Sequence, residues 1–393
     1  MTSQIPTPLE KLLEVAAGKR SLTLGVPAAT GNIDRRFPLT PEGVGMLVSR
    51  GIDVRMETGA GETIHYPDAV YLRAGAHVVG RAETLCCDIV LHLAPISVAD
   101  ARRLRRGSLL LTLFHPENQN ADALRLLLER HVIAVALDLI TDGQGHTPFA
   151  DILNEIDGRA AMATASSLLA DAIHGKGILL GGVAGVVPCE VTVIGAGLAG
   201  LAAARSAVGL GAMVRMFDTD VYRLRRAVRE LGPAIVASAM HPRVVIAALR
   251  TADVVVATPL GIPHIVTPEV VSGMKRGVVT FCLGDNPQPV FPTMRCVDLA
   301  SARACDSAEE GRRVCYVNAA GAVPRTVAMA LSDTLISMFS DIMLCGGALS
   351  NSLKLHPGLQ KAVYTFMGRV VNQRMAMFLG VRPIDINMLL QFS

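Results

Sequence analysis

The stretch from Val191 to Asp218, VTVIGAGLAGLAAARSAVGLGAMVRMFD, constrains the fold of this chain more than any other. The apolar run 191–194 is typical of a buried parallel strand, because it reserves no polar face for water and is too short for a helix. Gly195, Gly197 and Gly200 follow at G-x-G-x-x-G spacing. Such glycines permit a tight turn, close approach of the backbone to a pyrophosphate and close packing of the next helix on the sheet.

The residues after the glycines complete a nucleotide-binding pattern. A helix is expected over 198–210, and its first residues, Leu198 and Ala199, would place a phosphate on the positive end of the helix. A second strand over 213–217 ends in Asp218. A carboxylate there would accept hydrogen bonds from both adenosine ribose hydroxyls and repel a 2′-phosphate, which favours NAD over NADP. A glycine triplet alone also fits a plain turn between strand and helix, but the ordered succession favours cofactor binding.

The composition limits the class of protein. A chain of 393 residues can form two domains, and 51% hydrophobic with 18% charged residues argues against disorder. A net charge of +3 is too small to indicate nucleic acid, so the arginine clusters at 102–106 and 223–226 are expected on solvated helix faces. The eight cysteines form no C-x-x-C pair, which predicts neither a metal site nor a disulfide framework but reduced thiols in a cytoplasmic protein. No signal peptide or membrane-spanning stretch is expected.

Alternating apolar runs and helical patterns predict the architecture. The expected fold is α/β, with two doubly wound parallel-sheet, Rossmann-like domains and a cleft between them. We expect a substrate or catalytic domain from 1–138 plus 325–393, and a NAD-binding domain from 139–324. The expected strands are 22–26, 54–57, 89–93, 109–114, 132–140, 191–194, 213–217, 253–257, 278–283 and 315–317. The expected helices are 40–51, 68–74, one from near 97, 121–130, 152–174, 198–210, 268–274, 327–344 and 359–378.

Polar residues that follow strands are the candidates for chemistry, because ligands bind at the carboxyl ends of parallel strands. Arg36, His115, Asp285 and Asn318 meet this condition. An arginine fork suits a substrate carboxylate, and a histidine, with an ordinary pKa of about 6.5, suits proton transfer. Asp285 would orient that histidine or assist attack of water on an imine. Taken singly, each also fits a plain role as a surface charge, a satisfied strand-end residue or part of a turn.

The sequence resembles the alanine dehydrogenase and nicotinamide nucleotide transhydrogenase alpha-subunit family over nearly its whole length. The resemblance rests on the motifs GVPAATGNIDRRFPLTPEGV, METGAGE, LAPI, LTLFHPE, LNEIDGRAAM, GKGILLGGVAGVVP, the glycine fingerprint and NAAGAVPRT, which occur in the family's order and spacing.

The resemblance implies roles for particular residues. It places the substrate-carboxylate arginine at Arg36, the acid/base histidine at His115, the catalytic aspartate at Asp285 and the active-site asparagine at Asn318. Asp285, Asn318 and Leu260 are also assigned to the cofactor site. It further implies a small-molecule substrate and a homo-oligomer, a dimer or a hexamer.

Two positions separate this chain from parts of that family. Transhydrogenase subunits usually carry an acidic residue where Asn318 stands, which favours the dehydrogenase branch. Family alanine dehydrogenases carry K-V-K-E-P where this chain has Leu91–Pro95, so the substrate-binding lysine aligns with Leu93. His92 is the candidate replacement, although adjacent strand residues point to opposite faces. Alanine itself is therefore not the expected substrate.

Three hypotheses follow. The first is a NAD(H)-dependent oxidoreductase that acts on an amino acid, 2-oxo acid or imine, with His115 as acid/base. The second is a NAD(H)-binding transhydrogenase alpha-type subunit, which Asn318 disfavours. The third is a catalytically diverged NAD-binding biosynthetic protein, which the loss of the lysine favours and the retained Arg36, His115 and Asp285 disfavour.

Overall fold

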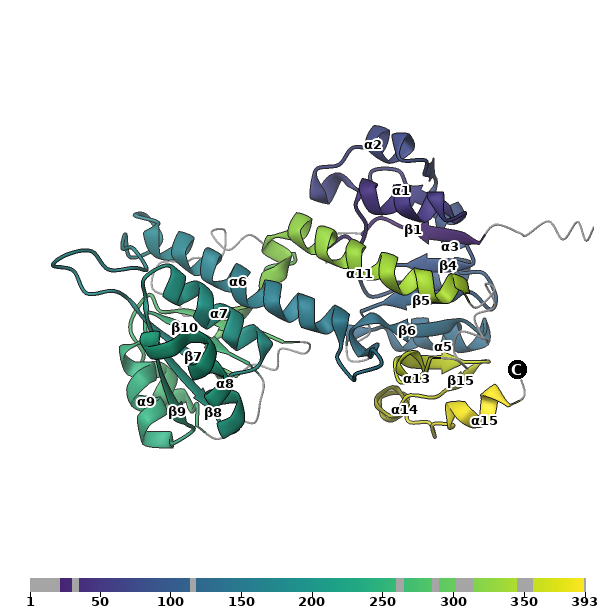
Figure 1. Ribbon diagram of the computed structural model, residues 1–393. Helices are drawn as coiled ribbons and strands as arrows, with labels where there is room; N and C mark the ends of the chain where they lie inside the picture. Colours follow the sequence, from purple (N-terminus) through teal and green to yellow (C-terminus); the bar gives the residue numbers. More distant parts are fainter. Residues whose placement is uncertain are drawn as a thin grey trace, which may run out of the picture.

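The computed structural model describes residues 22–29, 35–113, 118–258, 265–284, 290–301, 314–344 and 356–391, with the side chains of 340–344 left aside. These residues form two lobes that are joined by the long helices α6, Pro148–Ala170, and α11, Pro324–Leu344 (Figure 1). Each lobe is built on its own twisted sheet with helices on both faces. The expected fold class is thus confirmed, while the expected domain limits stay a prediction.

The first sheet has the strand order β15-β14-β6-β5-β4-β1-β2-β3 among the described residues. Its strands are β1 Thr23–Val26, β2 Asp53–Glu57, β3 His77–Val79, β4 Ile89–Leu91, β5 Leu109–Thr112, β6 Ile133–Ala136, β14 Val363–Phe366 and β15 Arg369–Val370. The strands from β1 to β6 pair in parallel, whereas β14 and β15 add an antiparallel edge. The order reverses between β1 and β4, so the loops after these two strands face a topological switch point.

The second sheet is parallel throughout its described strands, in the order β12-β13-β11-β10-β7-β8-β9. Its strands are β7 Glu190–Ile194, β8 Met213–Asp218, β9 Ile235–Ala239, β10 Val254–Ala257, β11 Val279–Cys282, β12 Arg295–Asp298 and β13 Val314–Val317. The switch point lies between β7 and β10. Because the glycine loop follows β7, the fold brings it to the position where such sheets bind ligands.

Helices cover both sheets. Besides α6 and α11 they are α1 Pro41–Ser49, α2 Asp68–Arg73, α3 Arg81–Leu85, α4 Val98–Arg103, α5 Ala121–Glu129, α7 Leu198–Gly209, α8 Val221–Leu231, α9 Pro242–Thr251, α10 Pro268–Ser272, α13 Pro357–Gln360, α14 Gln373–Leu379 and α15 Ile386–Leu390. Short 3₁₀ helices are η1 Glu62–Ile64, η3 Leu137–Leu139, η4 Gly232–Ala234 and η6 Ala319–Ala322. Thr40 caps α1 as expected, accepting a hydrogen bond from the Gly43 amide at 3.2 Å.

Two expected elements are wrong. The helix expected over 359–378 is the end of α13, the hairpin β14–β15 and the start of α14. Met367 and Gly368 form the two-residue turn of this hairpin with φ angles of 50° and 73°. A turn with two positive φ angles matches strand twist, but Met-Gly lacks the usual Asn-Gly signal. The strand expected over 132–140 ends at Ala136 and continues as η3.

Each sheet has one apolar cluster on each face. The first sheet packs one face on α6 and α11, and the second sheet packs one face on α6 and α7. Helix α6 therefore contributes to the cores of both lobes and runs from one lobe to the other (Figure 1). In the described part of the chain, no helix combines the length and the apolar character needed to cross a bilayer.

Candidate active site

The three fingerprint glycines occupy three different environments. Gly195 has a φ angle of 103°, and a Cβ there would lie 1.8 Å from Thr258 Oγ1. A Cβ on Gly200 would lie 1.8 Å from the Gly195 carbonyl oxygen. A Cβ on Gly197, which precedes the first residue of α7, would meet no protein atom within 4 Å. The first and third glycines are thus required by packing, and the second leaves open space at the amino end of a helix.

A pocket of about 380 Å³ opens at this helix end. Its lining comes from the glycine loop, from the ends of β10 and β11, and from α6 and α8. The lining residues are Asn154, Ala196, Gly197, Leu198, Ala199, Leu201, Arg223, Arg226, Thr258, Leu283 and Gly284. Backbone amides of a helix amino terminus favour an anion, so the pocket fits the pyrophosphate of a dinucleotide.

Asp218 lies at the carboxyl end of β8 and is only 3% exposed. Its Oδ2 accepts a hydrogen bond from the Ala196 amide at 2.6 Å, and its Oδ1 accepts one from the Asp220 amide at 2.7 Å. The carboxylate therefore holds the glycine loop in place. Since a carboxylate offers about four acceptor positions, it retains capacity for the ribose hydroxyls expected from the sequence.

Arg223 and Arg226 line the pocket, although the sequence predicts a solvated helix face for them. They are 44% and 63% exposed, which agrees with the expected solvated helix face, and they line the pocket as well. Arg223 Nε lies 3.6 Å from Asp220, and Arg226 Nε lies 2.7 Å from Glu230. The start of α8 directly after the β8 carboxyl end is the signal that identifies them, because residues at that helix start lie near the strand ends.

Asn318 is held in an unusual conformation. Its φ and ψ angles of 52° and 51° are left-handed, a region that asparagine tolerates better than most residues. Its Nδ2 donates to Asp298 Oδ2 at 2.9 Å, and Asp298 Oδ1 accepts from the Ala300 amide at 2.8 Å. Asp298, which the sequence interpretation missed, therefore fixes the direction of the Asn318 amide.

The loop that carries Arg36 docks beside this pair. The Arg35 amide donates to the Ala300 carbonyl at 3.1 Å, and Arg35 Nη2 donates to the Ser301 carbonyl at 3.3 Å. Arg36 is half-buried and also has an interaction partner. Ala300 packs so closely on η6 that a Cβ on Gly321 would lie 2.3 Å from its Cα. The structure thus brings the Arg36 loop of the first lobe to the segment that positions Asn318 in the second.

Comparisons with known proteins place this site in a family. Residues 25–154 match the model of the alanine dehydrogenase/PNT N-terminal domain, and residues 161–373 match that of the C-terminal domain. The chain belongs to the alanine dehydrogenase/PNT family. It is 30% identical to alanine dehydrogenase from Mycobacterium tuberculosis over 92% of this chain and 97% of that protein.

Two solved structures share the fold. An L-alanine dehydrogenase superposes with a TM-score of 0.81 and 25% identity, over 91% of this chain and 99% of the other. A transhydrogenase from Sinorhizobium meliloti superposes with a TM-score of 0.70 and 21% identity, over 90% and 99%. The chain is accordingly an alanine dehydrogenase-like, NAD-dependent oxidoreductase, and its glycine loop, Asp218 and the amino end of α7 would hold NAD.

The family's lysine position is apolar and buried here. Leu93 is 4% exposed and belongs to the cluster that packs the first sheet on α6 and α11. His92 is equally buried but lies near Asp100, whose pKa it helps to lower. Ala101 of α4 packs in the cluster on the other face of the first sheet from Leu93. The placement of His92 beside α4 therefore does not support a contact with substrate, and the assignment stays a prediction.

Three assigned residues lie outside the described part of the chain: His115, Asp285 and Leu260. Gly284, the last described residue before Asp285, lines the pocket at the glycine loop. The roles that the family resemblance implies for these three residues stay predictions.

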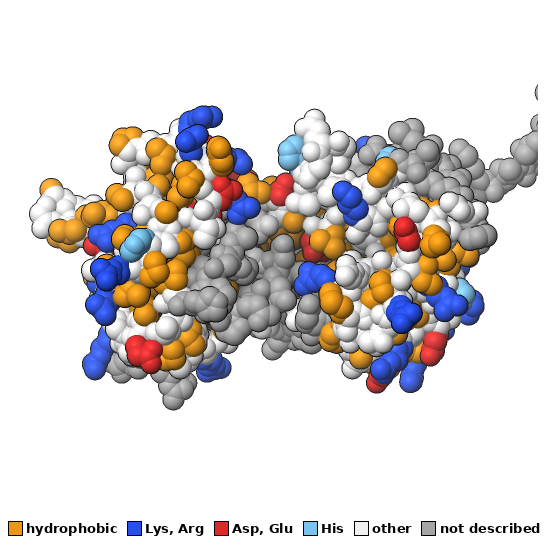
Figure 2. All heavy atoms as spheres, turned by 90° about the horizontal axis from the view of Figure 1, so that it is seen from below, with side chains coloured by type: hydrophobic (Ala, Val, Ile, Leu, Met, Phe, Trp, Pro, Cys, Tyr) orange, Lys and Arg blue, Asp and Glu red, His pale blue; other side chains and the backbone are white. Residues whose placement is uncertain are grey.

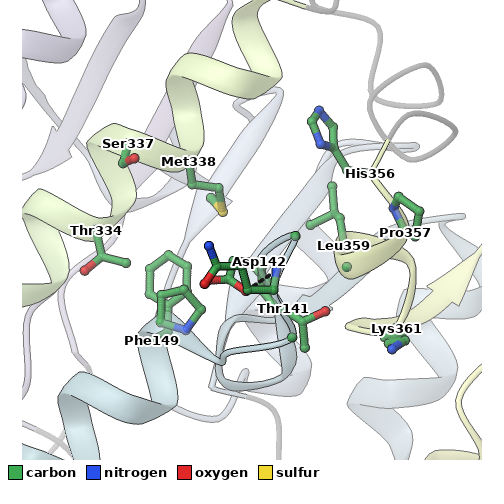
Figure 3. A pocket seen from close by; sticks show the side chains of 16 residues that line it. Thr141, Asp142, Phe149, Thr334, Ser337, Met338, His356, Pro357, Leu359 and Lys361 are labelled. Atoms are coloured by element: carbon green, nitrogen blue, oxygen red, sulfur yellow. Dashed lines mark hydrogen bonds between the residues drawn. The ribbon is translucent and has the colours of Figure 1, made fainter.

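A larger pocket of about 790 Å³ lies in the first lobe, between the loop after η3 and helices α11 and α13 (Figure 3). Phe149, Thr334, Met338, His356 and Leu359 are among its lining residues. None of the site residues expected from the sequence lines it, whereas Gly197, Leu198 and Ala199 of the expected cofactor site line the smaller pocket. Arg36, His92 and Asn318 line neither of these two pockets. Among the described residues, no group of three or more His, Cys, Asp or Glu side chains is arranged to hold a metal ion.

Proposed function

We propose that this protein is a NAD(H)-dependent dehydrogenase that acts at the carbon–nitrogen bond of an amino acid, or on the matching 2-oxo acid or imine. The proposal is supported by a pocket that fits the pyrophosphate of a dinucleotide and by the Arg36 loop docked beside Asn318. When bound, NAD supplies the hydride acceptor for such a reaction.

The chain's own residues would bind substrate and move the proton. Arg36 would hold the substrate carboxylate through its planar fork. His115 would take a proton from the substrate amino group as the carbon–nitrogen double bond forms. Asp285 would assist attack of water on the imine, and the Asn318 amide would help to position nicotinamide and substrate.

The hydrogen bond between Asn318 and Asp298 is the observation that favours a dehydrogenase over a transhydrogenase subunit. The Asn318 Nδ2 group donates to Asp298 Oδ2 at 2.9 Å. An acidic residue at position 318, as the family resemblance implies for transhydrogenase subunits, would bring two carboxylates together and raise the pKa of one of them. Asp298 thus suits an amide at this position.

The substrate is proposed to be less polar than alanine or to carry its polar group elsewhere. Leu93 places an apolar side chain where the family's lysine would supply a cation. A keto or imino oxygen or nitrogen would find no charged donor at that position.

We further propose that the protein works as a cytoplasmic homo-oligomer. The support is the reduced state expected for its scattered cysteines and an exposed apolar segment that suits contact with a second copy. A transhydrogenase-type subunit and a diverged NAD-binding protein are the alternatives that the first experiment separates.

The first experiment measures NADH oxidation by the purified protein against 2-oxo acids with ammonia and against preformed cyclic imines. Parallel reactions contain NADPH, or NADH with an oxidised NADP analogue as hydride acceptor. Oxidation of NADH with one acid or imine supports the dehydrogenase. Transfer to the NADP analogue without any acid or imine contradicts it and supports the transhydrogenase reading. NADH binding without turnover in any reaction contradicts it and supports the diverged protein.

The carboxylate role of Arg36 has a matched control in its neighbour. Arg36→Lys keeps the charge but loses bidentate geometry, at a cost of about 1.5–3 kcal/mol. With the substrate found above, kcat/KM is expected to fall about 10- to 100-fold at unchanged NADH affinity. Arg35→Lys, whose side chain donates to Ser301, should lower kcat/KM much less. An equal fall of kcat/KM in the two variants would contradict the carboxylate role of Arg36 and attribute the effect to docking of the loop.

A further inference from the structure

Two cysteines stand opposite each other on neighbouring strands of the second sheet. Cys296 of β12 and Cys315 of β13 are register partners in a parallel pair. Side chains of register partners project from the same face, and neighbouring strands lie about 4.8 Å apart. The Cα atoms of disulfides are about 4.4–6.8 Å apart. The backbone therefore already holds these two thiols at a separation that a disulfide can span.

The two thiols differ in environment. β12 is the edge strand of the sheet among the described residues, and Cys296 is exposed, whereas Cys315 is 1% exposed. A hydrogen bond from Cys315 to the sulfur of Cys296 lowers the pKa of Cys296 to about 6. The same hydrogen bond, followed by burial, raises the pKa of Cys315 well above its ordinary value. An exposed thiolate thus lies beside a buried, protonated thiol.

The other described cysteines lack this arrangement. Cys282 of β11 is in register with Val317, not with Cys315, and burial raises its pKa to about 11. Burial also raises the pKa of Cys87 to about 11. Cys305 and Cys345 lie outside the described residues. Within the described part of the chain, the register pair alone combines a reactive, exposed sulfur with a partner in bonding reach.

We propose that Cys296 and Cys315 form a peroxide-sensitive pair that closes to a disulfide across β12 and β13. The Cys296 thiolate attacks one oxygen of hydrogen peroxide, the O–O bond breaks, and a sulfenic acid and hydroxide result. The Cys315 sulfur then attacks the sulfenic sulfur, its proton passes to the departing oxygen, and water leaves. The hydroxide takes up the proton that Cys296 released to solvent on ionising, so the two thiols lose two electrons and the peroxide is reduced to two waters.

The position of the pair connects it to the site. Cys296 lies two residues before Asp298 on β12, and Cys315 lies three residues before Asn318, so the cross-link joins the strands whose ends carry the Asp298–Asn318 hydrogen bond. Any effect of oxidation on turnover rests on the proposed function. Formation of the disulfide does not depend on the proposed function, and the test therefore detects the disulfide directly.

The full chain is treated with a small excess of hydrogen peroxide at pH 7, remaining thiols are alkylated, and peptides are mapped without reduction. The expected result is one cross-linked peptide pair containing Cys296 and Cys315, with the loss of two hydrogen atoms and complete reversal by dithiothreitol. Cys86→Ser, which removes another exposed thiol, should leave this cross-link unchanged. A cross-link from Cys296 to Cys305, or over-oxidation of Cys296 without any cross-link, would overturn the proposal.

Two variants of Cys315 separate its two roles. Cys315→Ser keeps a hydrogen-bond donor but cannot form the disulfide, so Cys296 alkylation should still level off above about pH 6 while the cross-link is lost. Cys315→Ala removes the donor as well, so the alkylation midpoint should rise toward the ordinary thiol value of about 8.5. Identical pH profiles in the two variants would show that Cys315 does not activate Cys296. Thermal unfolding of both variants verifies that the sheet is formed.

Discussion

At the scale of single residues, the glycine loop shows three reasons for the same amino acid. Gly195 needs a positive φ angle, and Gly200 allows α7 to contact the Gly195 carbonyl. Neither constraint applies to Gly197, since its φ angle is −71° and a Cβ on it would lie in open space. Its conformation permits alanine, so the fold does not require glycine here, and the proposed pyrophosphate site supplies a reason for it.

Alanine substitutions at these positions separate binding from folding. Gly197→Ala should change stability by no more than about 1 kcal/mol, the difference between glycine and alanine at a helix cap. It should weaken NADH binding at least about tenfold, because the methyl group would occupy ligand space. Gly200→Ala should instead lower the melting temperature, since its methyl group would clash with backbone. Fluorescence titration and thermal unfolding measure both, and unchanged NADH affinity in Gly197→Ala would contradict the assigned pocket.

At the scale of elements, α6 connects the cofactor lobe to the segment after Asn318. Asp157 of α6 is buried, and its Oδ1 accepts a hydrogen bond from the Ala320 amide of η6 at 2.5 Å. A Cβ on Gly158 would lie 2.2 Å from the Ala199 carbonyl, so α6 and α7 pack with their backbones in contact. This single helix thus sets the position of the glycine loop relative to Asn318.

Removing the Asp157 carboxylate should leave the buried Ala320 amide without its acceptor. Asp157→Ala is expected to cost about 1–3 kcal/mol of unfolding free energy, and Asp157→Asn, which keeps an acceptor, should cost less. Glu155→Ala is the control on the same helix, since it breaks only an exposed ion pair with Arg159, worth about 0.3–0.5 kcal/mol. Urea unfolding compares them. Equal losses for Asp157→Ala and Glu155→Ala would contradict this role of α6.

In the first lobe, ionised side chains join helices α3 and α4 to strand β2. Arg81 of α3 donates to both carboxylate oxygens of Asp100 at 2.8 Å and to Glu57 of β2 at 2.8 Å. The hydrogen bonds that Asp100 accepts, from Arg81 above all and also from Ser97, lower the pKa of its carboxyl group. Arg81 also donates to the Ala28 carbonyl at 3.0 Å, so the cluster holds the loop that follows β1.

The stability that Asp100 contributes should be lost in acid. A lowered folded-state pKa means that the contribution is fully present above the unfolded value of about 3.9 and disappears as pH falls through the folded value. Asp100→Asn should therefore be less stable than the unchanged chain near neutral pH, with a difference that shrinks below about pH 4. Urea unfolding across this range measures the difference. A difference that does not change with pH would contradict the role of this ionised carboxylate, and Asp122→Asn, at an exposed position, is the control.

At the scale of the whole molecule, a segment between α6 and β7 projects away from the second lobe. The arm, residues 171–189, extends beyond the helices (Figure 1), and hydrophobic side chains lie on the projecting end (Figure 2). Ile173, Leu179, Val183, Val186 and Val187 are exposed by 79%, 66%, 56%, 63% and 80%. Apolar side chains concentrated on a projecting segment are typical of a contact with another chain, which agrees with the proposed homo-oligomer.

Charging the arm should lower the oligomeric state. Val187→Asp would place a carboxylate in the expected contact, and burial of that charge without a partner is costly. Light scattering coupled to size-exclusion chromatography should show a smaller particle or a concentration-dependent one. Val244→Asp on α9, at a position that is 46% exposed outside the arm, should leave the particle unchanged. If the Val187→Asp protein kept its particle size, the result would contradict a role of the arm in the interface.

Most of the local structure could be predicted from the sequence. The strand before Gly195, the helix after Gly197, the Asp218 strand end and the Thr40 cap follow from patterns within a few residues. Each depends on side-chain periodicity, on a steric demand for glycine or on a local hydrogen bond, and all three are properties of a short segment. The fold class and the cofactor followed from the order of these segments.

Only the tertiary structure decided which distant residues meet. The Arg35–Ala300 hydrogen bond, the Asp157–Ala320 contact and the register of Cys296 with Cys315 join segments that no local pattern relates. The sequence predicts a helix where the β14–β15 hairpin lies. Local patterns cannot show this hairpin, because β14 pairs with β6, a strand more than two hundred residues earlier in the chain. Periodicity reports which face of an element is apolar, whereas long-range packing selects the partner that covers it.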